Sequence, residues 1–163
     1  MLTREQFLPH EMRIVAGLRT QGASDEQVIV RVKSENLFQY PTERMVANRA
    51  TVCLRRLDAM APTDAACAAR GIDPKTAVEA ASSLTGLMAS GAPTQADQAI
   101  FYSMICRYDI VRELVLVEIG ERLQNFDYAF TAVDLNAFMT RFTTEYPDAA
   151  RWTEATVKRI KGS

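Results

Sequence analysis

The chain has 163 residues, of which 48% are apolar, and a formal net charge of −1. This length suits one ordinary domain or two small bundles that share a core, and the near-neutral charge gives no global sign of a nucleic-acid-binding protein. The most apolar run, IVRELVLVEIG, is interrupted by Arg112, Glu113 and Glu118, so we expect no membrane-spanning segment and no membrane partner. Because Arg4 and Glu5 come too early for the apolar part of a signal peptide, we predict a cytoplasmic protein.

Helix signals follow one another closely through the first sixty residues. Pro9 suits a first helical turn, and Gly22 suits the end of the same helix. A capping box at Ser24 begins a second helix, which extends to about residue 37. Pro41 separates this helix from a third one, which Thr42 caps. The sequence therefore predicts three helices with short connections, an arrangement compatible with a helix-turn-helix.

Helix signals continue to the end of the chain, and strand signals are almost absent. Residues 109–124 are apolar over most of the helix circumference, so we expect them at the centre of a second bundle. Residues 61–77 are rich in small side chains and form the expected hinge. We predict an all-α fold, with a trihelical unit over residues 1–60 packed on a larger bundle over residues 61–163, or one continuous domain. The other helices are expected over Thr63–Arg70 and Asp73–Ser90, from Thr94 onwards, over Thr131–Tyr146 and from Thr153 onwards.

The predicted helix TERMVANRATVCLRRLDAM, residues 42–60, has an outer face rich in arginine. On a helical wheel, Arg44 and Arg55 lie opposite the apolar stripe, whereas Arg49 and Arg56 lie on one flank. Asn48 lies near the outer face as well. Arginine offers a planar fork to phosphate oxygens, and asparagine adds a neutral hydrogen bond. The pattern therefore indicates contact with a nucleic-acid backbone.

An alternative for the same face is a solvated surface, with its arginines paired to acids of neighbouring helices such as Glu26 or Glu35. The charge is unevenly spread, with a net of +2 over residues 1–60, −6 over residues 61–150 and +3 over residues 151–163. Such asymmetry suggests that the ends and the middle meet different partners. The acidic middle could dock a basic protein, so a protein scaffold without nucleic-acid binding is the alternative function.

Patterns for catalysis and metal binding are missing from the sequence. His10 is the only histidine and is expected on the surface. Cys53, Cys67 and Cys106 are scattered without metal-ligand spacing, and we expect them to be small buried side chains in a reducing compartment. The glycines form no phosphate-binding pattern. We therefore predict no enzyme activity, no cofactor and no metal.

Two further side chains need partners. Glu118 falls inside the apolar arc of the predicted central helix, and a buried carboxylate there is expected to pair with Arg107 or Arg141. Tyr40 borders the turn before the arginine-rich helix. It could stack on a base, but packing against the core is the preferred interpretation.

Three segments resemble those of a known family in their order and spacing. They are ENLF followed by a helix that ends in LRRL, the helix RYDIVRELVLVEI, and the closing segment RWTEATVKRI. In this order they resemble the BrxA family, small proteins of the BREX bacteriophage-exclusion systems, over nearly the whole chain. The resemblance implies an intracellular helical protein, similar in part to the antitermination factor NusB. It also implies sequence-independent binding of double-stranded DNA and no enzyme activity.

The resemblance assigns the basic residues of two helices to DNA binding. We predict duplex DNA as the ligand, with RNA as an alternative, and other BREX proteins as partners. The oligomeric state is left open. The predicted contacts are Arg44, Asn48, Arg49, Arg55 and Arg56 in the arginine-rich helix, with Lys158, Arg159 and Lys161 near the end of the chain.

Overall fold

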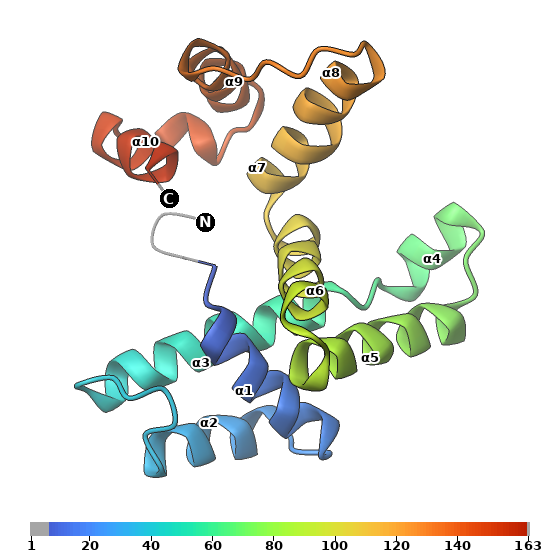
Figure 1. The fold of residues 1–163 in the computed structure, drawn as a ribbon, viewed down its shortest axis with the longest axis vertical. Helices are drawn as coiled ribbons and strands as arrows, with labels where there is room; N and C mark the ends of the chain where they lie inside the picture. The colour runs from blue at the N-terminus through green and yellow to red at the C-terminus, as the bar shows by residue number, and fades with distance from the viewer. Residues whose placement is uncertain (1–6, 163) are drawn as a thin grey trace. The chain divides into compact units, whose positions relative to one another are not determined.

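The computed structural model describes residues 7–162. Arg4 and Glu5, on which the expectation about a signal peptide rests, lie outside the described residues. Residues 7–162 form helices and connecting segments without any strand (Figure 1), which confirms the predicted all-α class. None of the helices described is both long enough and apolar enough to cross a membrane.

The chain divides into two compact units. The N-terminal unit, Phe7–Arg107, contains α1 (Pro9–Thr20), α2 (Asp25–Ser34), α3 (Glu43–Ala59), α4 (Asp64–Arg70), α5 (Pro74–Ser90) and α6 (Pro93–Arg107). The described part of the C-terminal unit, residues 108–162, contains α7 (Asp109–Arg112), a π-helix (Glu113–Ile119), α8 (Gly120–Gln124), α9 (Ala132–Glu145), a 3₁₀ turn (Ala149–Arg151) and α10 (Glu154–Lys161).

The helix boundaries follow the capping residues in the sequence. Ser24 and Gln27 form the predicted capping box at the start of α2, with the Gln27 amide 3.3 Å from the Ser24 hydroxyl. The Thr42 hydroxyl accepts a hydrogen bond from the amide of Met45, as predicted for the start of α3. However, α2 ends at Ser34, earlier than expected, because Asn36 adopts a left-handed conformation with φ of 45°.

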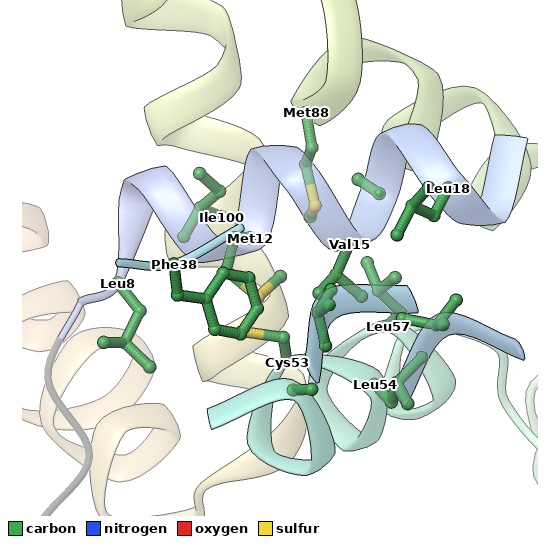
Figure 2. Packing of buried hydrophobic residues seen from close by; sticks show 14 of the residues in the cluster. Leu8, Met12, Val15, Leu18, Phe38, Cys53, Leu54, Leu57, Met88 and Ile100 are labelled. Carbon is green, nitrogen blue, oxygen red and sulfur yellow. The ribbon is translucent and has the colours of Figure 1, made fainter. Parts of the chain in front are cut away.

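The core of the N-terminal unit forms around α1, which packs against α3, α5 and α6. Figure 2 shows α1 between Met88 of α5 on one side and Leu57 of α3 on the other. Met12 and Val15 of α1 are fully buried in this cluster. The apolar residues of α1 are therefore buried against α5 and α6 as well as against α3.

The division of the chain differs from the predicted boundary at residue 60. Ala81 and Met88 of α5 and Ile100 of α6 belong to the same buried cluster as α1 and α3. The predicted boundary therefore falls inside the N-terminal unit, and the units divide after Arg107 instead. Small residues after position 60 suggested a hinge, but Ala77 and Ala81 are buried on α5. Alanine allows two helices to approach closely, which explains why this segment packs.

Residues 109–124 are helical, as predicted, but they do not form a buried centre. Leu116 and Leu123 are 58% and 52% exposed, and Ile110 is the only buried residue of this segment among those described. The middle of the segment is the π-helix, whose i to i+5 bonding widens the turn. Side chains beyond it are therefore rotated away from the stripe that an α-helical wheel predicts, and the expectation of a central helix is wrong.

The core of the C-terminal unit lies instead on α9. Phe138, Met139 and Phe142 of α9 are buried. The Phe142 ring stacks on Tyr146, with centroids 4.2 Å apart, and lies 5.9 Å from the ring of Trp152. These aromatic contacts hold the segment that leads from α9 into α10.

Candidate nucleic-acid interface

The outer face of α3 presents the arginine surface that the sequence predicts, in part. Arg44, Asn48 and Arg55 are exposed, and we call these three residues the α3 face. Arg44 and Arg55 are eleven positions apart, so the α3 face extends over about 16 Å of helix axis. Within residues 7–162, no ion pair involves Arg44 or Arg55.

The two acids of α3 are paired with cations from other helices. Lys33 of α2 lies 3.3 Å from the Glu43 carboxylate, and Arg19 of α1 lies 3.4 Å from Asp58. In addition, burial raises the pKa of Asp58 above its usual value, and Asp25 adds to this effect while Arg19 opposes it. Both acids are therefore largely compensated, and the α3 face keeps its positive charge. The helical wheel gave no sign of Lys33 or Arg19, because they lie on other helices.

The acids that the sequence offered as partners for the arginines are occupied elsewhere. Glu35 accepts a hydrogen bond from Arg31 at 3.2 Å within α2. Glu26 accepts a hydrogen bond from the Ser24 hydroxyl at 3.0 Å, and hydrogen bonds from the backbone and from Ser24 lower its pKa. Neither acid forms an ion pair with the α3 face. The structure therefore does not contain the pairing with Glu26 or Glu35 that the solvated-surface interpretation expects.

Arg56 is placed wrongly by the sequence analysis. Its side chain is 0% exposed, and its guanidinium donates a hydrogen bond to the carbonyl oxygen of Phe7 at 3.1 Å. The chain that enters α1 therefore covers the flank of α3 on which Arg56 lies. A wheel drawn for α3 alone cannot show this cover. Arg56 is part of the protein interior and does not reach a DNA backbone.

Arg49 lies on the same flank and is half-buried. Its charge acts on Tyr40, whose hydroxyl donates a hydrogen bond to the buried Glu11. This hydrogen bond and burial raise the pKa of Tyr40, and the Arg49 charge opposes them. Tyr40 also packs edge-on against Phe38, with ring centroids 6.3 Å apart. The packing interpretation of Tyr40 is therefore confirmed, and a phosphate contact through Arg49 stays a prediction.

The second predicted basic surface lies on α10 of the C-terminal unit. Lys158, Arg159 and Lys161 are exposed, and Ile160 between them is buried. Lys161 donates a hydrogen bond to the side chain of Asn136 on α9 at 2.6 Å. The three cations therefore lie on the solvent side of a short helix that Ile160 anchors.

Arg122 is a further charged centre, which the sequence analysis missed. Its guanidinium lies 3.5 Å from Glu118, 2.8 Å from Asp127 and 2.7 Å from Asp134. Glu118 four residues earlier was a readable signal, but the other two carboxylates come from the loop and from α9. Glu118 also pairs with Arg141, which confirms one of its two predicted partners.

The cysteines and the histidine, which we expect neither to catalyse a reaction nor to bind a metal, differ in burial. Cys53 and Cys67 are buried as predicted, whereas Cys106 is half-buried, and His10 is exposed. Within residues 7–162, no group of three or more His, Cys, Asp or Glu side chains is placed to hold a metal ion.

Comparison with known proteins gives one match. Nothing among the curated proteins matches the chain, and nothing among the solved structures does either, so the partial likeness to NusB stays a prediction. The sequence model of the BrxA family matches residues 1–163, which is the whole chain. The three segments in which the resemblance was found therefore sit within a match that spans both units, and the chain belongs to the BrxA family.

Proposed function

We propose that this chain is a non-enzymatic component of a BREX-type phage-defence system that binds duplex DNA with little sequence preference. Membership of the BrxA family associates the chain with BREX systems. The DNA contact is inferred from the α3 face, with Lys158, Arg159 and Lys161 as a second basic surface. The cytoplasm is the expected location, and other BREX proteins are the expected partners.

The observation that carries the proposal is the charge balance of α3. Glu43 and Asp58 are each paired with a cation of another helix, whereas Arg44 and Arg55 form no ion pair within the described chain. An ordinary surface helix gains stability from pairs of opposite charge, and an arginine face without such pairs is available to an anionic partner. Arg44 lies in the first turn, where the helix dipole disfavours a cation and favours a bound phosphate.

The small sequence preference follows from the chemistry of the face. Arginine forks bind phosphate oxygens without reading the bases, and such contacts position a protein on DNA. Asn48 is the one amide on the α3 face that suits a base edge. The affinity should therefore come mainly from the release of counterions and should depend steeply on salt.

The test is fluorescence anisotropy of a labelled random-sequence duplex over a salt series. We compare the wild-type chain with the double variant Arg44→Gln/Arg55→Gln, since Arg56 is buried and Arg49 is half-buried. The five proposed phosphate contacts, through Arg44, Arg55, Lys158, Arg159 and Lys161, give a slope of log K against log salt of about −4.5, and loss of two contacts makes it shallower by about 1.8. A competing RNA duplex of the same length tests whether DNA is preferred.

The matched control is Arg31→Gln/Lys75→Gln, which removes the same charge from exposed positions of the same unit. This control should keep the wild-type slope. Equal slopes for all three proteins, with helix content unchanged by circular dichroism, would contradict the assignment of DNA binding to the α3 face.

A further inference from the structure

The loop between α8 and α9 exposes two aromatic side chains. Phe126 and Tyr128 are 79% and 76% exposed. Large aromatic residues at such exposure are unusual on a monomer surface and mark interaction sites when they are grouped. Leu123 and Val133, which flank the loop, are also exposed. We call Phe126 and Tyr128 the aromatic pair.

Phe126 occupies a backbone position that normally holds glycine. Its φ is 58°, and α8 ends in a Schellman motif, with the Asp127 amide bonded to the Arg122 carbonyl at 2.9 Å. The ends of α1, α2 and α4 use the same left-handed position, and there it is filled by residues suited to it, namely Gly22, Asn36 and Gly71. A phenylalanine at this position is disfavoured for folding, so its presence points to a role of the exposed ring.

Arg122 holds the loop in one conformation. Its guanidinium donates to the Asp127 carboxylate and to the Ala129 carbonyl, both at 2.8 Å, and lies 5.5 Å from the centre of the Phe130 ring. Residues 127 and 129 are therefore tied to Arg122, while the aromatic pair between and beside them faces solvent. A loop fixed in this way loses little conformational entropy when it binds.

The surroundings of the aromatic pair are acidic. Residues 109–134 contain six Asp or Glu residues and two Arg residues. Three carboxylates surround Arg122, and even with Arg141, which pairs with one of them, the acids are in excess. This charge repels DNA, so base stacking is not the use of the pair. The complementary surface is an apolar pocket with a positive rim.

The same unit contains such a pocket. It lies between the end of α9 and α10 and has a volume of about 620 Å³. Ala149, Trp152 and Val157 supply its apolar lining, while Lys158, Lys161 and Glu154 supply its charged lining, in which two cations outnumber one acid. Pockets of this kind accept aromatic anchors, and a lining with an excess of lysine attracts an acidic surface.

We propose that the aromatic pair of one copy inserts into the pocket between α9 and α10 of a second copy. The contact joins two different surfaces and is therefore heterologous, so it links copies head to tail. It is independent of the α3 face, whose arginines take no part. Lys158 and Lys161 would be shared between this contact and the proposed DNA surface, so self-association and DNA contact through α10 compete.

The test is sedimentation velocity of the full chain over a concentration series, together with the fluorescence of Trp152. Trp152 is the only tryptophan, so its emission reports on the pocket alone. The wild type should gain mass with concentration, and its emission should shift to the blue as the pocket fills. Phe126→Gly should weaken this association about tenfold or more. The same variant should raise the melting temperature, because glycine suits the left-handed position.

Mixing of complementary variants makes the test specific. Phe126→Gly keeps the pocket, and Lys158→Glu/Lys161→Glu keeps the aromatic pair, so a mixture should form a complex that neither variant forms alone. Val30→Ser, which removes an exposed apolar residue of α2, is the control and should associate as the wild type does.

Three outcomes would overturn the proposal: a wild type that stays monomeric at every concentration, a Phe126→Gly variant that associates normally, or a mixture without a complex. None of them bears on DNA binding through α3. Conversely, Arg44→Gln/Arg55→Gln should self-associate normally whatever its DNA affinity, so the two proposals fail separately.

Discussion

Arg55 and Arg56 are neighbours in the sequence and have opposite environments. Arg55 is exposed on the outer face of α3, and Arg56 is fully buried against the carbonyl oxygen of Phe7. The sequence places both on a helix and both away from the apolar stripe. It cannot tell them apart, because the cover over Arg56 comes from residues almost fifty positions earlier.

This difference predicts a large loss of stability on removal of Arg56 and almost none on removal of Arg55. Arg56→Ala removes the donor to the Phe7 carbonyl and opens a cavity where a fully buried side chain was, so it should lower the free energy of unfolding by about 3 kcal/mol. Arg55→Ala should change it by about 0.5 kcal/mol or less, as is usual for surface positions. Urea unfolding measures both. A loss of stability in the Arg55 variant as large as in the Arg56 variant would mean that the burial assigned here is wrong.

Tyr40 predicts a pH dependence of stability. The hydrogen bond to Glu11 and burial raise the pKa of Tyr40 in the folded protein above its ordinary value of 10.0. The stability that the neutral hydroxyl contributes is therefore complete below about pH 10. It is lost as the pH rises through the raised pKa, since the unfolded chain gives up this proton first.

Tyr40→Phe tests this dependence. The variant should be less stable at neutral pH by about 1–3 kcal/mol, because Glu11 stays buried and loses a donor. Between pH 9 and 11 its urea midpoint should fall less than that of the wild type. A parallel decline of the urea midpoints of both proteins would contradict the link between the ionisation of Tyr40 and stability. Tyr128→Phe is the control, because it removes the same hydroxyl group from an exposed side chain.

At the scale of elements, local signals predicted where helices begin better than how they pack. The caps at Ser24 and Thr42 form as the sequence indicates, and the helix expected from Thr131 onwards begins with a capping box at that residue. These motifs depend on residues three positions apart, so a sequence shows them directly. The π-helix does not follow from any such local motif, and it changes which side of residues 109–124 faces the unit.

Arg122 carries a prediction for the loop of residues 125–131. Arg122→Met removes the donors to Asp127 and Ala129 but leaves the capping box of Thr131 and Asp134 in place. Amide hydrogen exchange of residues 127–129 should therefore become about tenfold faster, while the middle of α9 keeps its protection.

The control for this change is Arg112→Met, which removes an arginine of the same unit that pairs with Asp109, three residues earlier in the same helix. Exchange in the loop should then match the wild type. Should Arg122→Met leave the exchange of residues 127–129 unchanged, the loop would be held by something other than this guanidinium, and the preorganisation of the aromatic pair would lose its basis.

At the scale of the whole chain, the sequence predicted which residues of the candidate site are exposed better than it predicted where the exposed site ends. Arg44, Asn48 and Arg55 are exposed because the apolar stripe of α3 fixes the opposite face, and this stripe is readable. The burial of Arg56 and the compensation of Glu43 by Lys33 depend on contacts between helices. Such contacts are set by the packing of the whole unit, and no local pattern encodes them.

The predicted boundary at residue 60 lies inside the N-terminal unit, and this difference leads to a prediction about the entire unit. Met88 of α5 is fully buried in the cluster that also contains Met12 and Val15 of α1. Met88→Ala should lower the free energy of unfolding by about 3 kcal/mol. Because the core is shared, hydrogen exchange should accelerate in α1 and α3 as well as in α5.

Leu87→Ala is the matched control, since Leu87 precedes Met88 on the same helix and is exposed. It should cost about 1 kcal/mol or less. If the Met88 variant loses protection in α5 alone, residues 9–59 form a core of their own, and the three-helix unit expected from the sequence is the correct one. If protection falls in α1, α3 and α5 together, the arginine-bearing helix depends on a residue about thirty positions beyond it. In that case a fragment limited to residues 1–60 would be a poor reagent for testing the α3 face, and DNA-binding experiments need the full chain.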